Sequence, residues 1–136
     1  MRKIVIFAAN LMIPNAYGCD IPMGSYVSAV ISEYSLQLRL IDKENYHLTY
    51  KFWWPDDGGW QELHDFRGHW ECKGVDINLD FGDTVVSGVF TQKTLSVTGE
   101  TEKKTMALYF PETTNSSKLF GGRVYWPKSF LEENTN

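Results

Sequence analysis

Apolar and polar residues alternate along most of the chain from residue 24 to residue 126. The clearest case is the pair of segments 35–40 and 46–52, which alternate without a break on either side of the polar turn 42–45. A period of two residues is typical of β-strands that bury one face. We therefore predict a β-hairpin whose inward face carries Leu36, Leu38, Leu40, Tyr46, Leu48, Tyr50 and Phe52.

The same alternation predicts further strands, separated by turns that are rich in glycine, proline and acidic residues. These strands are expected at 68–72, 75–81, 84–90, 94–98, 106–110 and 119–126. Two apolar series in them are expected to face inward, namely Val75, Ile77, Leu79 and Phe81, and then Met106, Leu108 and Phe110. Helical spacing is confined to a short turn at 129–133.

About eight or nine short strands without a helical domain define an all-β protein. No internal repeat or linker divides the chain, and its 136 residues fit one domain. We predict that residues 19–136 form a single antiparallel up-and-down barrel of about eight strands, because closure removes exposed strand edges.

The first 18 residues have the features of a secretory signal peptide. Arg2 and Lys3 precede a short apolar stretch, and Ala16 and Gly18 supply the small side chains that signal peptidase requires. We predict that residues 1–18 are removed on export, which places the protein in the periplasm or outside the cell. The alternative is that 4–7 is a buried first strand.

Cleavage after Gly18 makes Cys19 the first residue of the mature chain. A bacterial lipoprotein carries its lipid on such a cysteine, although only Gly18 matches the pattern that usually precedes it. The competing hypothesis is a disulfide with Cys72, which an oxidising compartment permits and which would add about 4 kcal/mol through loop entropy. The third option is that Cys72 is a free buried thiol.

Composition narrows the class of partner. Acidic residues outnumber basic ones by 17 to 13, for a net charge of -4, which argues against nucleic acid. No apolar run reaches the roughly 18 residues of a membrane-spanning helix. Aromatic residues make up 15% of the chain, a heavy load for a small domain, and such side chains fill cores and recognition surfaces.

Between residues 24 and 81 the order of short motifs resembles that of a known family. Gly-x-Tyr at 24–26 is followed by Leu-x-Leu, Tyr-x-Leu, Gly-x-Trp and Ile-x-Leu at 36–38, 46–48, 68–70 and 77–79. This progression resembles small bacterial envelope barrels of the lipocalin-like (calycin) kind, such as the amino-terminal barrel of the copper-sensing outer-membrane lipoprotein. The resemblance implies a fold and a compartment. The Cys-x-x-Cys of that copper-sensing barrel is absent, so no metal role is carried over.

The most unusual stretch is an aromatic and acidic turn near the middle of the chain. Its candidate binding residues are Trp53, Trp54, Asp56, Asp57 and Trp60. Tryptophans beside carboxylates suit a sugar ring or the basic, apolar patch of a partner. The alternative is that these tryptophans plug the barrel mouth or staple a long loop.

Other groups of residues give weaker indications of function. The sequence has no nucleophile elbow, phosphate loop or zinc-protease motif, so we assign no catalytic residue. The three histidines lack the convergent geometry of a zinc site and are expected to be solvated, so we assign no metal or cofactor. Arg123 and Tyr125, on one face beyond the pair Gly121-Gly122, are a candidate anion contact, against the alternative of a bulge with Arg123 solvated.

Together these patterns predict an exported, non-enzymatic binding protein of the bacterial envelope. The leading hypothesis is a protein partner bound through the aromatic, acidic loop. A basic enzyme is the favoured class of partner, by analogy with envelope lysozyme inhibitors and toxin-immunity proteins. The alternatives are a lipocalin-like carrier of a small apolar ligand and a structural envelope lipoprotein.

Overall fold

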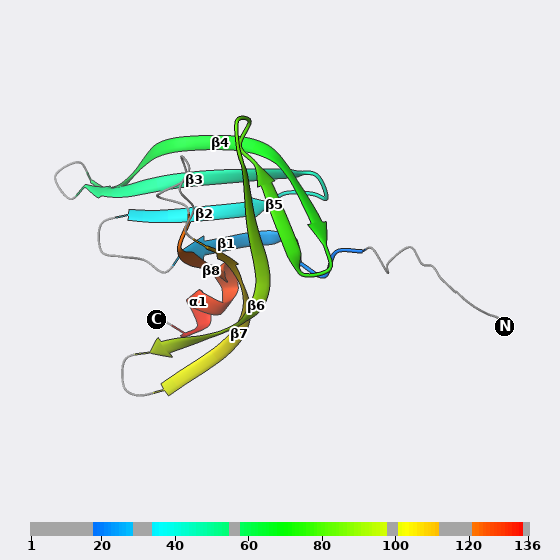
Figure 1. The fold of residues 1–136 in the computed structure, drawn as a ribbon. Coiled ribbons are helices and arrows are strands. Elements are labelled where there is room, and N and C mark those ends of the chain that lie inside the picture. Colours follow the sequence, from blue (N-terminus) through cyan, green and yellow to red (C-terminus); the bar gives the residue numbers. More distant parts are fainter. Residues whose placement is uncertain (1–17, 29–33, 55–57, 98–100, 112–120, 135–136) are drawn as a thin grey trace.

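The computed structural model describes residues 18–28, 34–54, 58–97, 101–111 and 121–134. Its elements are β1 (Gly24–Ser28), β2 (Tyr34–Leu40), β3 (Asn45–Trp54), β4 (Gly59–Lys73), β5 (Asp76–Asp80), β6 (Val85–Val97), β7 (Thr101–Phe110), β8 (Arg123–Pro127) and the helix α1 (Lys128–Asn134). The strands close a barrel in chain order, and each strand pairs antiparallel with the next (Figure 1). The predicted all-β up-and-down barrel and the helical turn near the carboxyl end are confirmed.

The predicted inward faces form the core. In the hairpin of β2 and β3, alternate residues point into the barrel. These residues are also opposed in the β2–β3 ladder, as Leu38 is to Leu48. One hydrophobic cluster joins this face to that of β5, where Ile77 and Leu79 have no exposed surface. Alternation therefore builds the core, because within the closed part of the barrel every second side chain of a strand points to the same interior.

Two residues of the expected inward series are exposed instead. Val75 is 38% exposed because it lies in the turn that begins at Gly74, before β5 starts. Met106 is 40% exposed because β7 pairs with β8 only through residues 108–110, so no facing wall covers position 106. An alternating pattern shows which residues share a face of a strand. How much of that face is buried depends on the neighbouring strands.

Several predicted strands have different bounds in the structure. The two strands predicted at 84–90 and 94–98 correspond to one strand, β6, which runs from Val85 to Val97. The segment 68–72 lies at the end of the 15-residue strand β4. The last strand starts at Arg123, and part of the predicted segment 119–126 lies outside the described residues. The glycine pair Gly121-Gly122 forms a bend before β8 and not a bulge within it.

Long strands make two hairpins extend beyond the closed part of the barrel. β4 pairs with β5 only from Trp70 onward, so the first part of β4 is paired with β3 alone. Likewise β6 pairs with β5 only as far as Val89, and its remainder pairs with β7 alone. In Figure 1 the β3–β4 hairpin reaches past the start of β2, and the β6–β7 hairpin curves round α1.

The amino end is tied to the barrel by a disulfide and two backbone hydrogen bonds. Cys19 and Cys72 are bonded, with their Cα atoms 5.3 Å apart, which confirms the predicted bridge. The amide of Asp20 donates to the carbonyl of Gly74, and the amide of Gly74 donates to the carbonyl of Gly18, both at 2.8 Å. A bridge of this kind is consistent with an exported protein. The predicted signal peptide falls almost wholly outside the described residues.

Candidate functional site

The first candidate site is the end of the β3–β4 hairpin. β3 ends at Trp54 and β4 begins at Gly59, and the register places Trp53 opposite Trp60 and Trp54 opposite Gly59. Gly58 and Gly59 adopt φ values of 92° and 108°, which glycine reaches without steric cost. The chain can therefore reverse tightly here and present its aromatic positions on both sides of the turn.

A register shift decides which tryptophans share a face. The β3–β4 ladder is irregular between Tyr50 and Lys51, where pairing passes from Tyr50 with His64 to Lys51 with Glu62. The extra residue in β4 moves every later position by one. Without it Trp53 would face Gln61, whereas with it Trp53 faces Trp60 across the ladder. The positions of Trp53 and Trp60 are thus directly opposed in the ladder.

The predicted loop residues are placed unequally. The structure brings Trp53 and Trp60 together and sets Trp54 on the other face, in the alternating series of the buried Tyr46 and Leu48. Asp56 and Asp57 lie outside the described residues.

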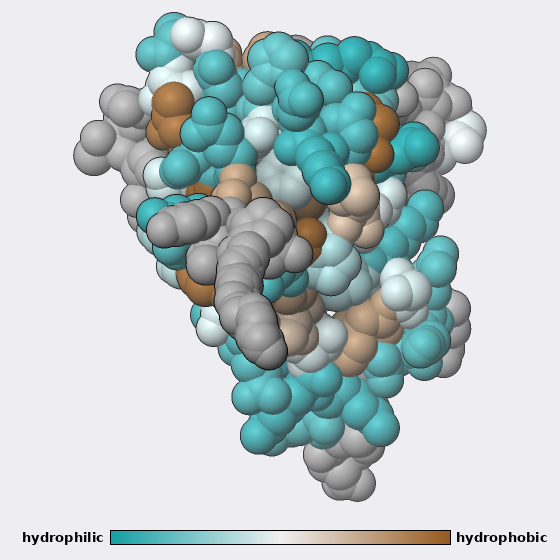
Figure 2. Space-filling model, turned by 90° about the vertical axis from the view of Figure 1, so that its right-hand side faces the viewer, coloured by the Kyte–Doolittle hydropathy of each residue, from teal (hydrophilic) through white to brown (hydrophobic). Residues whose placement is uncertain are grey.

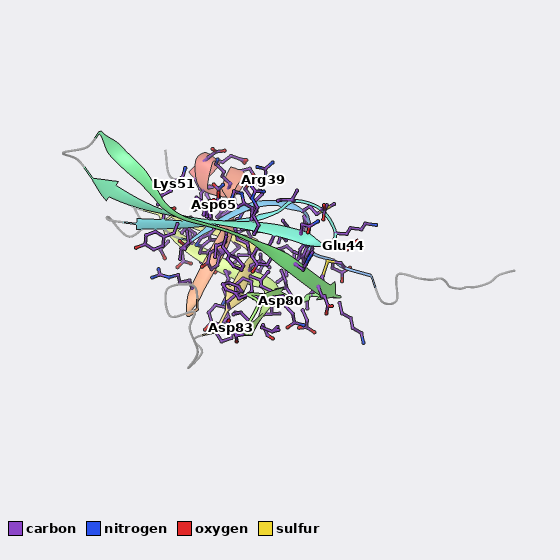
Figure 3. The ribbon with its side chains drawn as sticks, turned by 90° about the horizontal axis from the view of Figure 1, so that it is seen from above. Arg39, Glu44, Lys51, Asp65, Asp80 and Asp83 are labelled. Atoms are coloured by element: carbon purple, nitrogen blue, oxygen red, sulfur yellow. A yellow bond between two sulfur atoms is a disulfide. The ribbon has the colours of Figure 1, made fainter. Side chains whose placement is uncertain are left out.

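Charged side chains line the outer face of the sheet that leads to the hairpin end. A ring nitrogen of His47 lies 2.5 Å from a carboxylate oxygen of Asp65, and the Nε of Arg67 lies 4.0 Å from the same oxygen. Viewed from above, Arg39, Lys51 and Asp65 lie along the sheet of β2, β3 and β4 (Figure 3). This face carries both signs of charge, which suits contacts at the rim of a protein interface.

The histidines do not converge. His47 faces Asp65, while the Nδ1 of the exposed His69 lies 3.3 Å from the backbone carbonyl of Glu44. Across the described ranges, no group of three or more histidine, cysteine, aspartate or glutamate residues is placed to hold a metal ion.

The two residues of the candidate anion contact, Arg123 and Tyr125, lie in different environments. Tyr125 has no exposed surface and packs edge-to-face on Phe110, with their ring centroids 5.7 Å apart. Arg123 is half-buried and lies opposite Phe110 in the β7–β8 ladder. The two residues share a face of β8 as expected, but the tyrosine ring belongs to the packed interior.

A second candidate site, which sequence reasoning missed, is a groove of about 710 Å³ beside α1. It is lined by Pro22, Met23, Gly24, Ser25 and Tyr26 of β1 and its approach, Phe90, Thr105 and Met106 of β6 and β7, and Pro127, Lys128, Ser129 and Glu132 around α1. One feature of the sequence could have indicated this groove: Pro127 ends a strand, and helical spacing follows directly after it. Figure 2 views the barrel from the side of its amino end, where apolar patches and a hollow lie between hydrophilic margins.

Tyr26 forms part of the groove wall and connects it to the core. Its hydroxyl donates to the carbonyl of Pro22 at 2.6 Å, and its ring meets Phe90 edge-to-face at 6.5 Å. Burial raises the pKa of the Tyr26 hydroxyl from 10.0 to about 12. Met23 is 52% exposed and Met106 is 40% exposed, so the lining of the groove includes two flexible, polarizable side chains.

Comparison with protein-family models, with curated proteins and with solved structures finds no match for this chain. The geometry therefore defines the protein by its fold: a small, closed, disulfide-bonded antiparallel barrel with two projecting hairpins. Within the described residues, no helix is long and apolar enough to cross a membrane.

Proposed function

We propose that this protein is an exported, non-enzymatic binding protein of the bacterial envelope that recognises a protein partner through the end of its β3–β4 hairpin. The observation that carries the proposal is the register of Trp53 opposite Trp60 on a hairpin that extends beyond the barrel. Tryptophans are enriched among the residues that contribute most to protein–protein affinity. Two tryptophans at directly opposed positions of one ladder supply a large contact area at low entropic cost.

A basic partner fits the charge of the chain. The net charge of -4 and the sequence pI of about 5.3 favour association with a positively charged protein. Such association is faster at low ionic strength, because long-range attraction steers the encounter and salt screens it. A basic envelope enzyme that this protein inhibits is the favoured partner.

The filled interior favours a surface site over a small-ligand carrier. A carrier needs an internal cavity of roughly a few hundred Å³. The residues that would line it, among them Leu38, Tyr46, Ile77 and Leu79, are fully buried in one cluster. The structural-lipoprotein alternative needs the sulfur of Cys19, which the disulfide uses.

Affinity capture from an envelope extract tests the proposal. The wild-type protein is compared with Trp53→Ala/Trp60→Ala, with Trp54→Ala and with Val85→Ala, a control at a 59% exposed apolar residue remote from the hairpin end. We expect one basic protein to be captured by the wild type and the control, and lost with the double variant. The interaction is then measured with the purified partner at low and high salt.

Two outcomes would reject the aromatic hairpin as the site. One is capture of the same partner by the double variant with unchanged affinity. The other is equal loss in Val85→Ala, which would show that any apolar surface change suffices. A greater loss in Trp54→Ala than in the double variant would instead assign the contact to the opposite face of the hairpin.

A further inference from the structure

β7 has an edge beside the groove that no strand of the described residues covers. β7 is paired with β6 from Thr101 to Tyr109 but with β8 only through Leu108, Tyr109 and Phe110. By continuation of that register, position 106 would face Pro127. Proline has no amide hydrogen to donate, and β8 ends there as the chain turns into α1. The β7–β8 ladder therefore stops at Leu108, and α1 stands off from β7 with the groove between them.

The direction of the backbone groups along β7 follows from two hydrogen bonds. The amide of Phe90 donates to Val75, away from β7, and the carbonyl of Phe110 accepts from Gly122, away from β6. Residues of an antiparallel ladder point both backbone groups alternately to one neighbour and to the other. The amides and carbonyls of Glu102, Lys104 and Met106 therefore point away from β6. Among the described residues, no strand pairs with them.

The side chains of these three residues set the chemistry of an incoming strand. They lie on one face of β7, with Met106 at the groove beside Met23 and Tyr26, and with Lys104 and then Glu102 further out. An antiparallel strand that continues the line of β8 would meet Met106 first, then Lys104, then Glu102. Directly opposed residues of opposite charge stabilise a strand pair, and like charges destabilise it.

We propose that this edge binds an extended peptide segment of a partner protein by strand addition. The segment carries an apolar, an acidic and a basic residue at successive alternate positions, in that order from its amino end. The apolar side chain enters the groove against Met106, and the charged ones face Lys104 and Glu102. Backbone hydrogen bonds supply affinity and the alternate side chains supply specificity.

A second copy of this chain fits the edge less well. Antiparallel self-pairing that sets Glu102 against Lys104 also sets Lys103 directly against Lys103 of the other copy. Lysines on an edge strand are a common device against such self-association. The charge order of the edge thus favours a different chain over a copy of itself.

Two short labelled peptides test the proposal by fluorescence anisotropy. Both alternate threonine with leucine, glutamate and lysine, and they differ only in the order of the two charged residues. We expect the peptide with leucine, glutamate and lysine in that order to bind about tenfold more tightly than its charge-reversed partner, because both cross-strand pairs change sign. Equal affinity of the two peptides would overturn the proposal.

Three variants locate the site. Lys104→Pro removes an amide that points away from β6, so the β6–β7 ladder is kept, and binding should be lost. Lys104→Ala keeps the amide and should only weaken binding. Glu102→Lys/Lys104→Glu should reverse the preference between the two peptides, and this test holds even if the proline variant does not fold. Unchanged binding by a folded Lys104→Pro, or no reversal in the double variant, would contradict the strand addition.

Sedimentation of the protein without peptide tests whether a second copy of this chain occupies the β7 edge. We expect a monomer at concentrations at which the peptide binds. A dimer that disappears in Lys104→Pro would assign the edge to a second copy and overturn the proposal.

Discussion

The hydroxyl of Tyr46 donates a hydrogen bond to the backbone carbonyl of Asp80 at 2.7 Å, across the strand that lies between them. Tyr46 belongs to β3 and Asp80 to the end of β5, and the ring passes over Gly68 of β4. This contact joins β3 to β5 at the level where β4 and β5 are not paired with each other. It closes the barrel on the side where the β3–β4 hairpin begins to project.

A side chain at position 68 should therefore break the closure. A Cβ there would lie 2.7 Å from the Asp80 carbonyl oxygen and 2.8 Å from the Tyr46 ring, closer than such atoms can approach. We expect Gly68→Ala to lower the free energy of unfolding by about 1–3 kcal/mol. Tyr46→Phe, which keeps the ring and loses the hydrogen bond, should cost about 1 kcal/mol. Urea unfolding measures both, and a neutral Gly68→Ala would show that the ring is free to move aside.

The disulfide should contribute substantially to stability, because it joins residues that are 53 positions apart. Cys19→Ser/Cys72→Ser is expected to lower the free energy of unfolding by up to about 4 kcal/mol, since the unfolded chain regains the entropy of an open loop. Thermal unfolding with and without a reductant measures the effect. The double variant is its own control, because the reductant should shift the midpoint of the wild type and leave that of the variant unchanged.

Stability should fall in strong alkali. Burial raises the pKa of Tyr26 to about 12, and burial together with the charge of Asp80 raises the pKa of Tyr46. Each group stays protonated in the folded state while the unfolded chain ionises near pH 10. The unfolded state then binds fewer protons, so the free energy of unfolding falls as pH rises above 10, by up to about 1.4 kcal/mol per pH unit for each group.

Urea titrations from about pH 9 to about pH 12 follow this loss, because the Tyr26 pKa is 10.0 in the unfolded chain and about 12 in the folded protein. Tyr26→Phe is the control. The variant lacks the Tyr26 hydroxyl, so its stability should decline less steeply than that of the wild type. Identical slopes in the two proteins would show that Tyr26 does not retain its proton in the folded state.

Neighbouring positions of one alternating series should differ sharply in their tolerance. Ile77 has no exposed surface, so Ile77→Ala is expected to cost about 2–5 kcal/mol through lost burial and the cavity left behind. Val75 is 38% exposed in the turn, and Val75→Ala should stay within about 0.5 kcal/mol. Chemical unfolding of the two variants gives the comparison. A large loss at Val75 would mean that the turn packs more tightly than its exposure indicates.

Much of the fold could be read from the chain because its rules are local. A period of two residues puts Leu36, Leu38 and Leu40 on one side of a strand whatever the strand pairs with. Polar turns mark where each strand reverses, and strands joined by short turns pair with their neighbours in sequence. The bridge between Cys19 and Cys72 was also accessible, because the chain has two cysteines and the features of an exported protein.

The candidate sites depend on properties that no local pattern contains. The irregular register near Tyr50 decides that Trp53 faces Trp60, and a ladder register is a relation between two strands. The exposure of Met106 and the groove beside it arise because Pro127, 21 positions after Met106 in the sequence, ends the pairing of β8 with β7. Sequence by itself determined which residues could face inward. The tertiary structure alone decided where the barrel wall ends, because coverage of a face depends on the length and pairing of its neighbours.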